Sequence, residues 1–227
     1  MSSKISETRE RILESAWKLL AGSQASAVRM SDIAKQAGIS RQAVYLHFPT
    51  RTELLIATTR YIDEVKDIDA RLVKSRSASK GLERLEAFVE AWGNYIPEIY
   101  GVASAFIAMQ TKDEEAGAAW DDRMSAVRHG CEAAVEALAR DGRLTLSLST
   151  SEATDPLWGQ LSVENWALLR HSCGWFRHVT STCCNRRCAR RWSTEHVCPI
   201  EIEDDFLLCH ELGSQAIRIW FFVFRMY

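Results

Sequence analysis

The most constraining feature of the sequence is a pair of short helical segments joined by a turn that contains glycine. Apolar residues at helical spacing mark residues 32–37 and 41–48, and residues 38–40 (Gly-Ile-Ser) separate them. Ser40 is a favourable N-cap for the second segment, and Pro49 ends it, because proline removes a backbone donor. Two short helices joined by such a turn are typical of a helix-turn-helix motif.

Helices are also predicted on both sides of this motif. Residues 7–21 place apolar side chains on one face, and a glycine follows them as a stop signal. Thr50 starts a capping-box-like sequence, which predicts a connecting helix that continues to about Val73. We therefore expect a helix-turn-helix domain in residues 1–50, a connecting helix in 51–74, and a domain boundary in the polar stretch beyond it.

The following region, residues 82–176, has helical periodicity and little strand-type alternation. The pattern predicts helices over residues 82–92, 99–109 and 113–140, and another that is opened by Thr154-Asp155-Pro156. The predicted fold class is all-α, with an N-terminal three-helix domain and a C-terminal helical domain. A chain of 227 residues is long enough to bury a core without disulfide or metal support.

The composition of the chain indicates where in the cell the protein is found. No apolar run approaches the ~20 residues that span a bilayer, and the N-terminus lacks signal-peptide features. We expect a cytoplasmic protein whose seven cysteines are reduced. The net charge of -2 divides unevenly, with +4 on residues 1–60, -7 on residues 61–176 and +1 on residues 177–227. A basic N-terminus is expected if only that part meets a polyanion, although a solvated face explains it equally well.

The residues of the motif resemble a known family. Ile33-Ala34, Gly38-Ile39-Ser40, the run from Val44 to Phe48, and Arg51 before Leu54-Leu55 are similar to the tetracycline-repressor (TetR) family of bacterial transcription factors. Leu157-Trp158 through Trp166 to Gly174-Trp175 resembles the helix near its dimer interface. The resemblance implies a homodimeric repressor with a C-terminal ligand-binding and dimerisation domain, which binds a double-stranded DNA operator and releases it when a small-molecule effector binds.

A recognition helix in a major groove turns polar residues outward and packs its apolar side on the preceding helices. We expect Val44 and Phe48 to pack, with Leu46 as an additional candidate, and Arg41 and Gln42 to read base edges. The resemblance implies phosphate contacts for Tyr45, His47 and Arg51, and amide contacts are expected at the helix starts near Ser31 and Thr50. The predicted DNA-binding set is Ser31, Ser40, Arg41, Gln42, Tyr45, His47 and Arg51.

Two residues near the motif have alternative interpretations. His47 at a helix C-terminus can favour the helix dipole without contacting DNA. Arg29 stands where we expect a capping Ser or Thr. It either reaches a phosphate or leaves the capping role to Ser31.

The effector implied by the resemblance would bind among the C-terminal helices. Few buried charges can be assigned there, which favours a hydrophobic or amphipathic compound. The candidate lining residues are mainly aromatic: Trp92, Tyr95, Tyr100, Phe106, Met109, Trp120, Trp158 and Trp166. Helical spacing also explains each of them as core or dimer interface. No cofactor or metal is expected.

Residues 177–227 do not fit the pattern. Six of the seven cysteines lie beyond residue 170, and helical periodicity is lost until residue 204. Three explanations are open: a zinc site, a divergent tail that ends in a helix over residues 206–224, and a reading-frame change near Arg177, which we favour. Zinc ligands are available, although no Cys-x2-Cys pair exists: His178, Cys183, Cys184, Cys188, His196 and Cys198.

Alternative functions are an enzyme and a regulator whose assembly is impaired by this tail. The sequence contains no Gly-rich phosphate loop, metal-ligand helix motif or nucleophile elbow, which argues against an enzyme.

Overall fold

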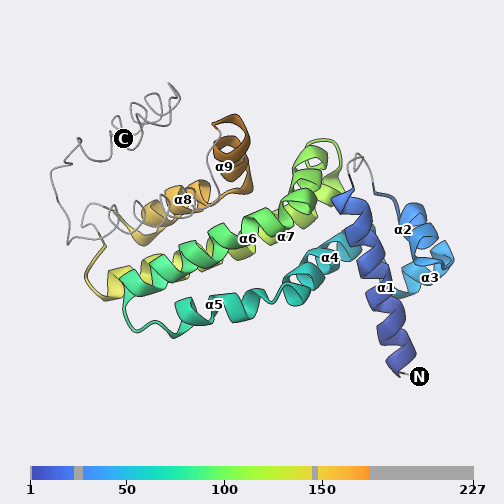
Figure 1. The fold of residues 1–227 in the computed structure, drawn as a ribbon, viewed down its shortest axis with the longest axis horizontal. Helices are drawn as coiled ribbons and strands as arrows, with labels where there is room; N and C mark the ends of the chain where they lie inside the picture. Colours follow the sequence, from blue (N-terminus) through green and yellow to red (C-terminus); the bar gives the residue numbers. More distant parts are fainter. Residues whose placement is uncertain (1, 23–27, 145–147, 174–227) are drawn as a thin grey trace.

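The computed structural model describes residues 2–22, 28–144 and 148–173 (Figure 1). These residues form helices and connecting turns and contain no β-strand, which confirms the all-α prediction. The elements are α1 (Ser2–Ala21), α2 (Met30–Ala37), α3 (Arg41–His47), α4 (Arg51–Val65), α5 (Ile68–Ser77), α6 (Gly81–Met109), α7 (Glu114–Arg140), α8 (Thr150–Gln160), α9 (Val163–Ala167) and the π-helical turn η1 (Leu168–Ser172). The predicted tail of residues 177–227, with its candidate zinc ligands and its helix over residues 206–224, lies outside the described residues.

The first three helices form the predicted three-helix unit at one end of the molecule (Figure 1). Ile12 of α1, Ile33 of α2 and Val44 of α3 are fully buried in a shared core. Gly38 adopts φ 68° between α2 and α3, a left-handed conformation that glycine tolerates without steric cost. Apolar packing and this turn together fix α3 relative to α1 and α2.

The predicted connecting helix is divided in two. α4 ends at Val65, and Asp67 adopts φ 53°, which interrupts the helical path before α5 begins. The Asp67 carboxylate then caps α5 by accepting a hydrogen bond from the Ala70 backbone N–H. A side-chain cap of this kind offers the backbone an alternative to helix continuation, and periodicity alone did not reveal it.

The predicted interruption between residues 93 and 97 is wrong, because α6 runs without a break from Gly81 to Met109 and contains Pro97. An interior proline costs roughly 3 kcal/mol through a lost hydrogen bond and a steric clash. α6 buries one side along its whole length, with Leu85, Trp92 and Phe106 in the core. This burial outweighs the local cost of the proline.

The predicted helix that starts at residues 154–156 begins earlier and is broken. Ser149 caps α8 through a capping box with Glu152, and Pro156 lies inside the helix. Ser162 then caps the short helix α9 by accepting a hydrogen bond from the Asn165 backbone N–H. Each serine cap therefore defines a helix start that apolar spacing alone did not indicate.

α6 and α7 form the long central pair, on which α1, α4, α5 and α8 pack, while α9 contacts α6 (Figure 1). They approach each other closely at Gly81, where an added Cβ would lie 2.5 Å from backbone atoms of Ala137 and Leu138. α1 contacts α6 and α4 contacts α7, so the helix-turn-helix unit is attached directly to the central pair. Among the described residues, none of the helices combines the length and the apolar character needed to cross a membrane.

Candidate nucleic-acid interface

The helix α3 is a short, well-capped segment between two side-chain caps. The Ser40 hydroxyl oxygen accepts a hydrogen bond from the Ala43 backbone N–H at 3.1 Å. Just beyond α3, the Thr50 hydroxyl oxygen accepts one from the Glu53 backbone N–H at 3.1 Å. These caps stabilise the start of α3 and the start of α4, each typically by about 1 kcal/mol.

The outward side of α3 carries the side chains expected to read DNA. Arg41 and Gln42 are exposed in its first turn, and Tyr45 is 38% exposed one turn later. An Arg41 guanidinium nitrogen donates to the Tyr45 hydroxyl at 3.2 Å, and the guanidinium lies 5.4 Å from the centre of the tyrosine ring. The pair holds two polar groups on one face of the helix, where a ligand can reach them.

Leu46 does not pack with Val44 and Phe48. Val44 and Phe48 are buried, whereas Leu46 is 86% exposed on the same face as Gln42. The reason is angular, because Leu46 lies about 160° around a regular helix from Val44. The expectation that Leu46 joins the packing side is therefore wrong.

Three further residues of interest lie at the start of α2 and at the end of α3. Arg29, not Ser31, is the N-cap residue of α2, and its backbone N–H donates to the Asp32 carboxylate at 3.2 Å. Ser31 is exposed in the first turn of α2. His47 is the last residue of α3 and is half-buried.

Arg51 lies in a setting different from the expected phosphate contact. Its guanidinium makes a two-pronged ion pair with Asp113, with both N–O distances 2.8 Å, and its Nε donates to the Val28 carbonyl at 2.7 Å. Glu115 lies 3.4 Å from the same guanidinium. The Arg51 side chain is only 12% exposed, and its hydrogen bonds hold the pKa of Asp113 below its usual range.

This ion pair joins the start of α4 to the turn between α6 and α7. Asp113 is also the N-cap of α7, because it accepts a hydrogen bond from the Ala116 backbone N–H. The sequence predicted a helix over residues 113–140 but contained no signal for the pairing of Asp113 with a residue 62 positions away. The contact connects the helix-turn-helix unit mechanically to the central helices.

A second charged cluster lies inside the C-terminal helices. Asp63 of α4 accepts hydrogen bonds from the Tyr95 hydroxyl at 2.6 Å and from the Arg123 guanidinium at 3.1 Å. That guanidinium also lies 5.1 Å from the centre of the Trp92 ring. Burial and the neighbouring Asp63 carboxylate raise the pKa of Tyr95 well above its usual value. Arg123 is largely buried, so this region contains a buried charged side chain that is paired with a carboxylate.

Among the residues that the structure describes, six of the eight candidate effector residues pack against one another in pairs. Trp92 and Tyr95 pack on each other, Phe106 stacks on Trp120, and Tyr100 packs on Trp166. All of these are buried except Tyr100, which is half-buried like Trp158, and Met109 is buried as well. The Trp166 indole N–H is buried and has no acceptor among the described residues.

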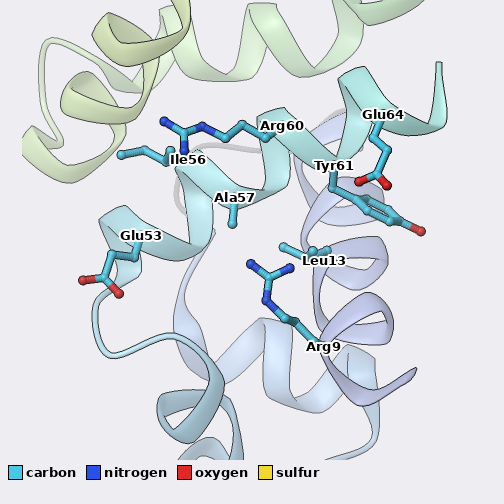
Figure 2. A pocket seen from close by; sticks show the side chains of 8 residues that line it. All are labelled: Arg9, Leu13, Glu53, Ile56, Ala57, Arg60, Tyr61 and Glu64. Atoms are coloured by element: carbon cyan, nitrogen blue, oxygen red, sulfur yellow. The ribbon is translucent and has the colours of Figure 1, made fainter. Parts of the chain in front are cut away.

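A pocket of about 390 Å³ lies elsewhere, between α1 and α4 (Figure 2). Four of its lining side chains are charged, and they come from both helices: Arg9, Glu53, Arg60 and Glu64. Leu13, Ile56, Ala57 and Tyr61 complete the lining. None of the predicted effector or DNA-binding residues contributes to this pocket.

Comparison with known proteins places this helix-turn-helix in a family. Residues 12–58, which enclose α2 and α3, match the model of the family described as bacterial regulatory proteins, tetR family. The helix-turn-helix segment of this chain is of the TetR type. A segment of 64 residues is 31% identical to the nucleoid occlusion factor SlmA of Marinomonas sp. (strain MWYL1). This match covers 28% of the chain and 32% of that protein, so it spans about a third of the curated relative.

The TetR-like fold extends through the C-terminal helices. A transcriptional regulator from Saccharomonospora viridis, solved in complex with choline, aligns with TM-score 0.64 at 20% identity and covers 83% of this chain and 98% of its own. FadR from Bacillus subtilis, solved with stearoyl-CoA, aligns with TM-score 0.64 at 14% identity over 79% of this chain and 96% of its own. NalD of Pseudomonas aeruginosa, the secondary repressor of the MexAB-OprM efflux pump, aligns with TM-score 0.61 at 19% identity, covering 85% and 98%. These likenesses show the fold of the TetR regulators.

Proposed function

We propose that this TetR-family regulator is a homodimeric repressor whose α3 helix binds in the major groove of a DNA operator. The observation that carries the proposal is the outward face of α3, where Arg41 and Gln42 are exposed in the first turn of a capped helix. Helix-turn-helix proteins use these N-terminal positions of the recognition helix to contact base edges. The core beneath α3 supports the helix and leaves this face free for DNA.

The chemistry of the two side chains assigns their roles. Arg41 matches the two acceptors on the guanine edge, and Gln42 matches the donor and acceptor on the adenine edge. Each such pair contributes roughly 1–3 kcal/mol of discrimination against a wrong base. Tyr45, Ser40 and the backbone amides near Ser31 supply contacts to phosphates that position α3 without reading sequence.

A homodimer is part of the proposal because one helix-turn-helix unit contacts only one half-site. Two copies related by a two-fold axis place their recognition helices one helical turn apart, roughly 34 Å, on an inverted repeat. α8 and α9 are candidates for the subunit interface, since residues 157–175 resemble that helix in the family.

The proposed effector is an amphipathic small molecule that binds among α4, α6 and α7. The aromatic side chains of this region supply apolar contact, and the Arg123 and Asp63 pair supplies charge. Choline and stearoyl-CoA, bound by the two regulators named above, are chemically different ligands on one fold and support a small-molecule role for this region. Repression ends if the effector prefers a different spacing of the two recognition helices, a coupling typically worth about 1–3 kcal/mol.

The experiment that tests the proposal is recovery of the operator. Full-length protein is incubated with sheared genomic DNA of its host at near-physiological salt, and the retained fragments are sequenced. We expect enrichment of an inverted repeat whose affinity falls steeply with salt, because several phosphates are neutralised at once. Retention of fragments without a common sequence would contradict the proposal.

A further inference from the structure

Leu46 is a large apolar side chain on the proposed DNA-binding face for which folding gives no reason. At 86% exposure it is the most exposed of the large apolar residues in the described part of the chain, ahead of Val73 at 58% and Leu168 at 53%. The core beneath α3 is already filled by Val44 and Phe48, and Arg9 covers the ring of Phe48. Leu46 therefore contributes little to the stability of this domain.

The position of Leu46 on α3 pairs it with Gln42. The two residues are four positions apart, so their side chains are neighbours on one ridge of the helix. Arg41 and Tyr45, also four positions apart and in contact through the guanidinium and the hydroxyl, form the adjacent ridge. The exposed side of α3 therefore has two ridges. One consists of Arg41 and Tyr45, and the other consists of the Gln42 amide followed by the Leu46 side chain.

That second ridge matches the major-groove edge of an A·T pair. Adenine offers N7 and N6 to an amide side chain, and its partner thymine offers a C5-methyl group, which only apolar side chains contact favourably. An isolated leucine surrounded by polar side chains is too small for a protein interface, which requires a contiguous apolar patch. On the basis of the proposed function, we infer that Leu46 is a specificity residue that contacts a thymine methyl group next to the adenine read by Gln42.

The inference predicts sensitivity to a single methyl group of the DNA. Deoxyuridine keeps the pairing of thymine and removes only its C5-methyl. At one thymine in each half-site, this replacement should weaken binding by about fourfold, or ~15-fold when both half-sites are changed, the loss expected for roughly one methyl group of apolar contact. The Leu46→Ala variant should bind the thymine and deoxyuridine duplexes equally well.

The test uses the full-length protein and the duplex that it selects from a randomised library. Each thymine of the selected site is replaced in turn by deoxyuridine, and the dissociation constant is measured by fluorescence anisotropy. The matched control is Val73→Ala, which removes an exposed apolar side chain of α5 and should keep the deoxyuridine sensitivity of the unmodified chain. Thermal unfolding of both variants should be unchanged, because both side chains are exposed.

The outcomes separate this inference from the proposed function. Loss of affinity at one position of each half-site, abolished by Leu46→Ala and retained by Val73→Ala, would support the thymine contact. A selected site whose affinity is unchanged by deoxyuridine at every position, or equal sensitivity of Leu46→Ala and the unmodified chain, would overturn the role of Leu46 alone. Failure to select any site would overturn the proposed function, and the role of Leu46 with it.

Discussion

In the helix-turn-helix unit Arg41, Gln42 and Tyr45 face solvent, whereas in the C-terminal helices Tyr95 and Phe106 are completely buried. In the first unit the short helix α3 has a local cap, and its exposed polar side chains lie opposite a small core. The second is built from long helices that bury side chains on several sides, so residues of the same chemical type serve mainly as core. The two regions therefore differ in the solvent exposure of their polar and aromatic side chains more than in the types of residue that they contain.

The Arg51–Asp113 ion pair connects these two regions. Arg51 is the first residue of α4, directly after the segment that follows α3, and Asp113 starts α7. The ion pair therefore joins the turn between α6 and α7 to the start of α4, beside the helix-turn-helix unit.

The largest expected effect is a loss of stability when a buried side chain of the C-terminal helices is removed. Phe106→Ala removes a fully buried ring stacked 5.9 Å from Trp120, which should lower the free energy of unfolding by about 3–5 kcal/mol. Chemical denaturation measures this loss, with Arg41→Ala as the matched exposed control that should leave stability unchanged. If Phe106→Ala kept full stability and altered only the response to an effector, Phe106 would belong to a binding site and not to the core.

Removal of either partner of the Arg51–Asp113 ion pair should cause a smaller loss of stability. Asp113→Asn and Arg51→Ala should each lower the free energy of unfolding by about 1.5–3 kcal/mol, because charge-assisted hydrogen bonds are lost from a largely buried site. The double variant should cost less than the sum of the two, since both changes remove one interaction. Full additivity would show that the two residues do not act together.

The same variants test where Arg51 acts. If Arg51 contacts phosphate in the complex, as the resemblance implies, Arg51→Ala should reduce the slope of log affinity against log salt by about one. If it stays paired with Asp113, the slope should be unchanged and Asp113→Asn should weaken operator binding to a similar degree. Titrations of the operator at several salt concentrations distinguish these outcomes.

Base readout should change affinity without changing stability. Gln42→Ala should reduce discrimination at one base pair of each half-site by about 1–3 kcal/mol, while thermal unfolding stays the same. The measurement is a set of competition titrations with single-base variants of the selected operator. A uniform loss over all sequences would place Gln42 among the phosphate contacts.

The smallest expected effect is a pH dependence at Asp113. The Arg51 hydrogen bonds lower the pKa of Asp113 in the folded chain, so the stabilisation is present above the ordinary value of 3.8 and is lost as pH falls toward the lowered value. The unmodified chain should therefore lose more stability in this acidic window than Asp113→Asn, as acid denaturation at constant ionic strength would show. Equal loss in both proteins would contradict the assigned ion pair.

The helix-turn-helix could be predicted from sequence because its signals are local. Gly38, Ser40 and Thr50 each define a helix boundary through the conformation or side chain of one residue, and the structure contains all three features. Leu46 was placed on the wrong side because an apolar residue in a short helix was assumed to pack. The angular position of one residue in a seven-residue helix was weaker information than its hydrophobicity.

The remaining differences arise from contacts between distant parts of the chain. Pro97 suggested a helix end, but burial of α6 on the neighbouring helices keeps it continuous. Asp63 and Arg123 are ordinary charged residues in the sequence, and only the packing of α4 against α7 brings them together beside Trp92. Pairings over 60 or more positions leave no periodic signal, which is why this pair was not predicted.

The most direct test of the central claim is a parallel selection from a randomised duplex library with the unmodified full-length chain and the Arg41→Ala variant. Our account predicts that both proteins enrich an inverted repeat with half-sites about one helical turn apart, and that Arg41→Ala loses the preference for guanine at one symmetric position. Enrichment of identical sequences by both proteins, or of no sequence by the unmodified chain, would contradict the assignment of α3 as the recognition helix.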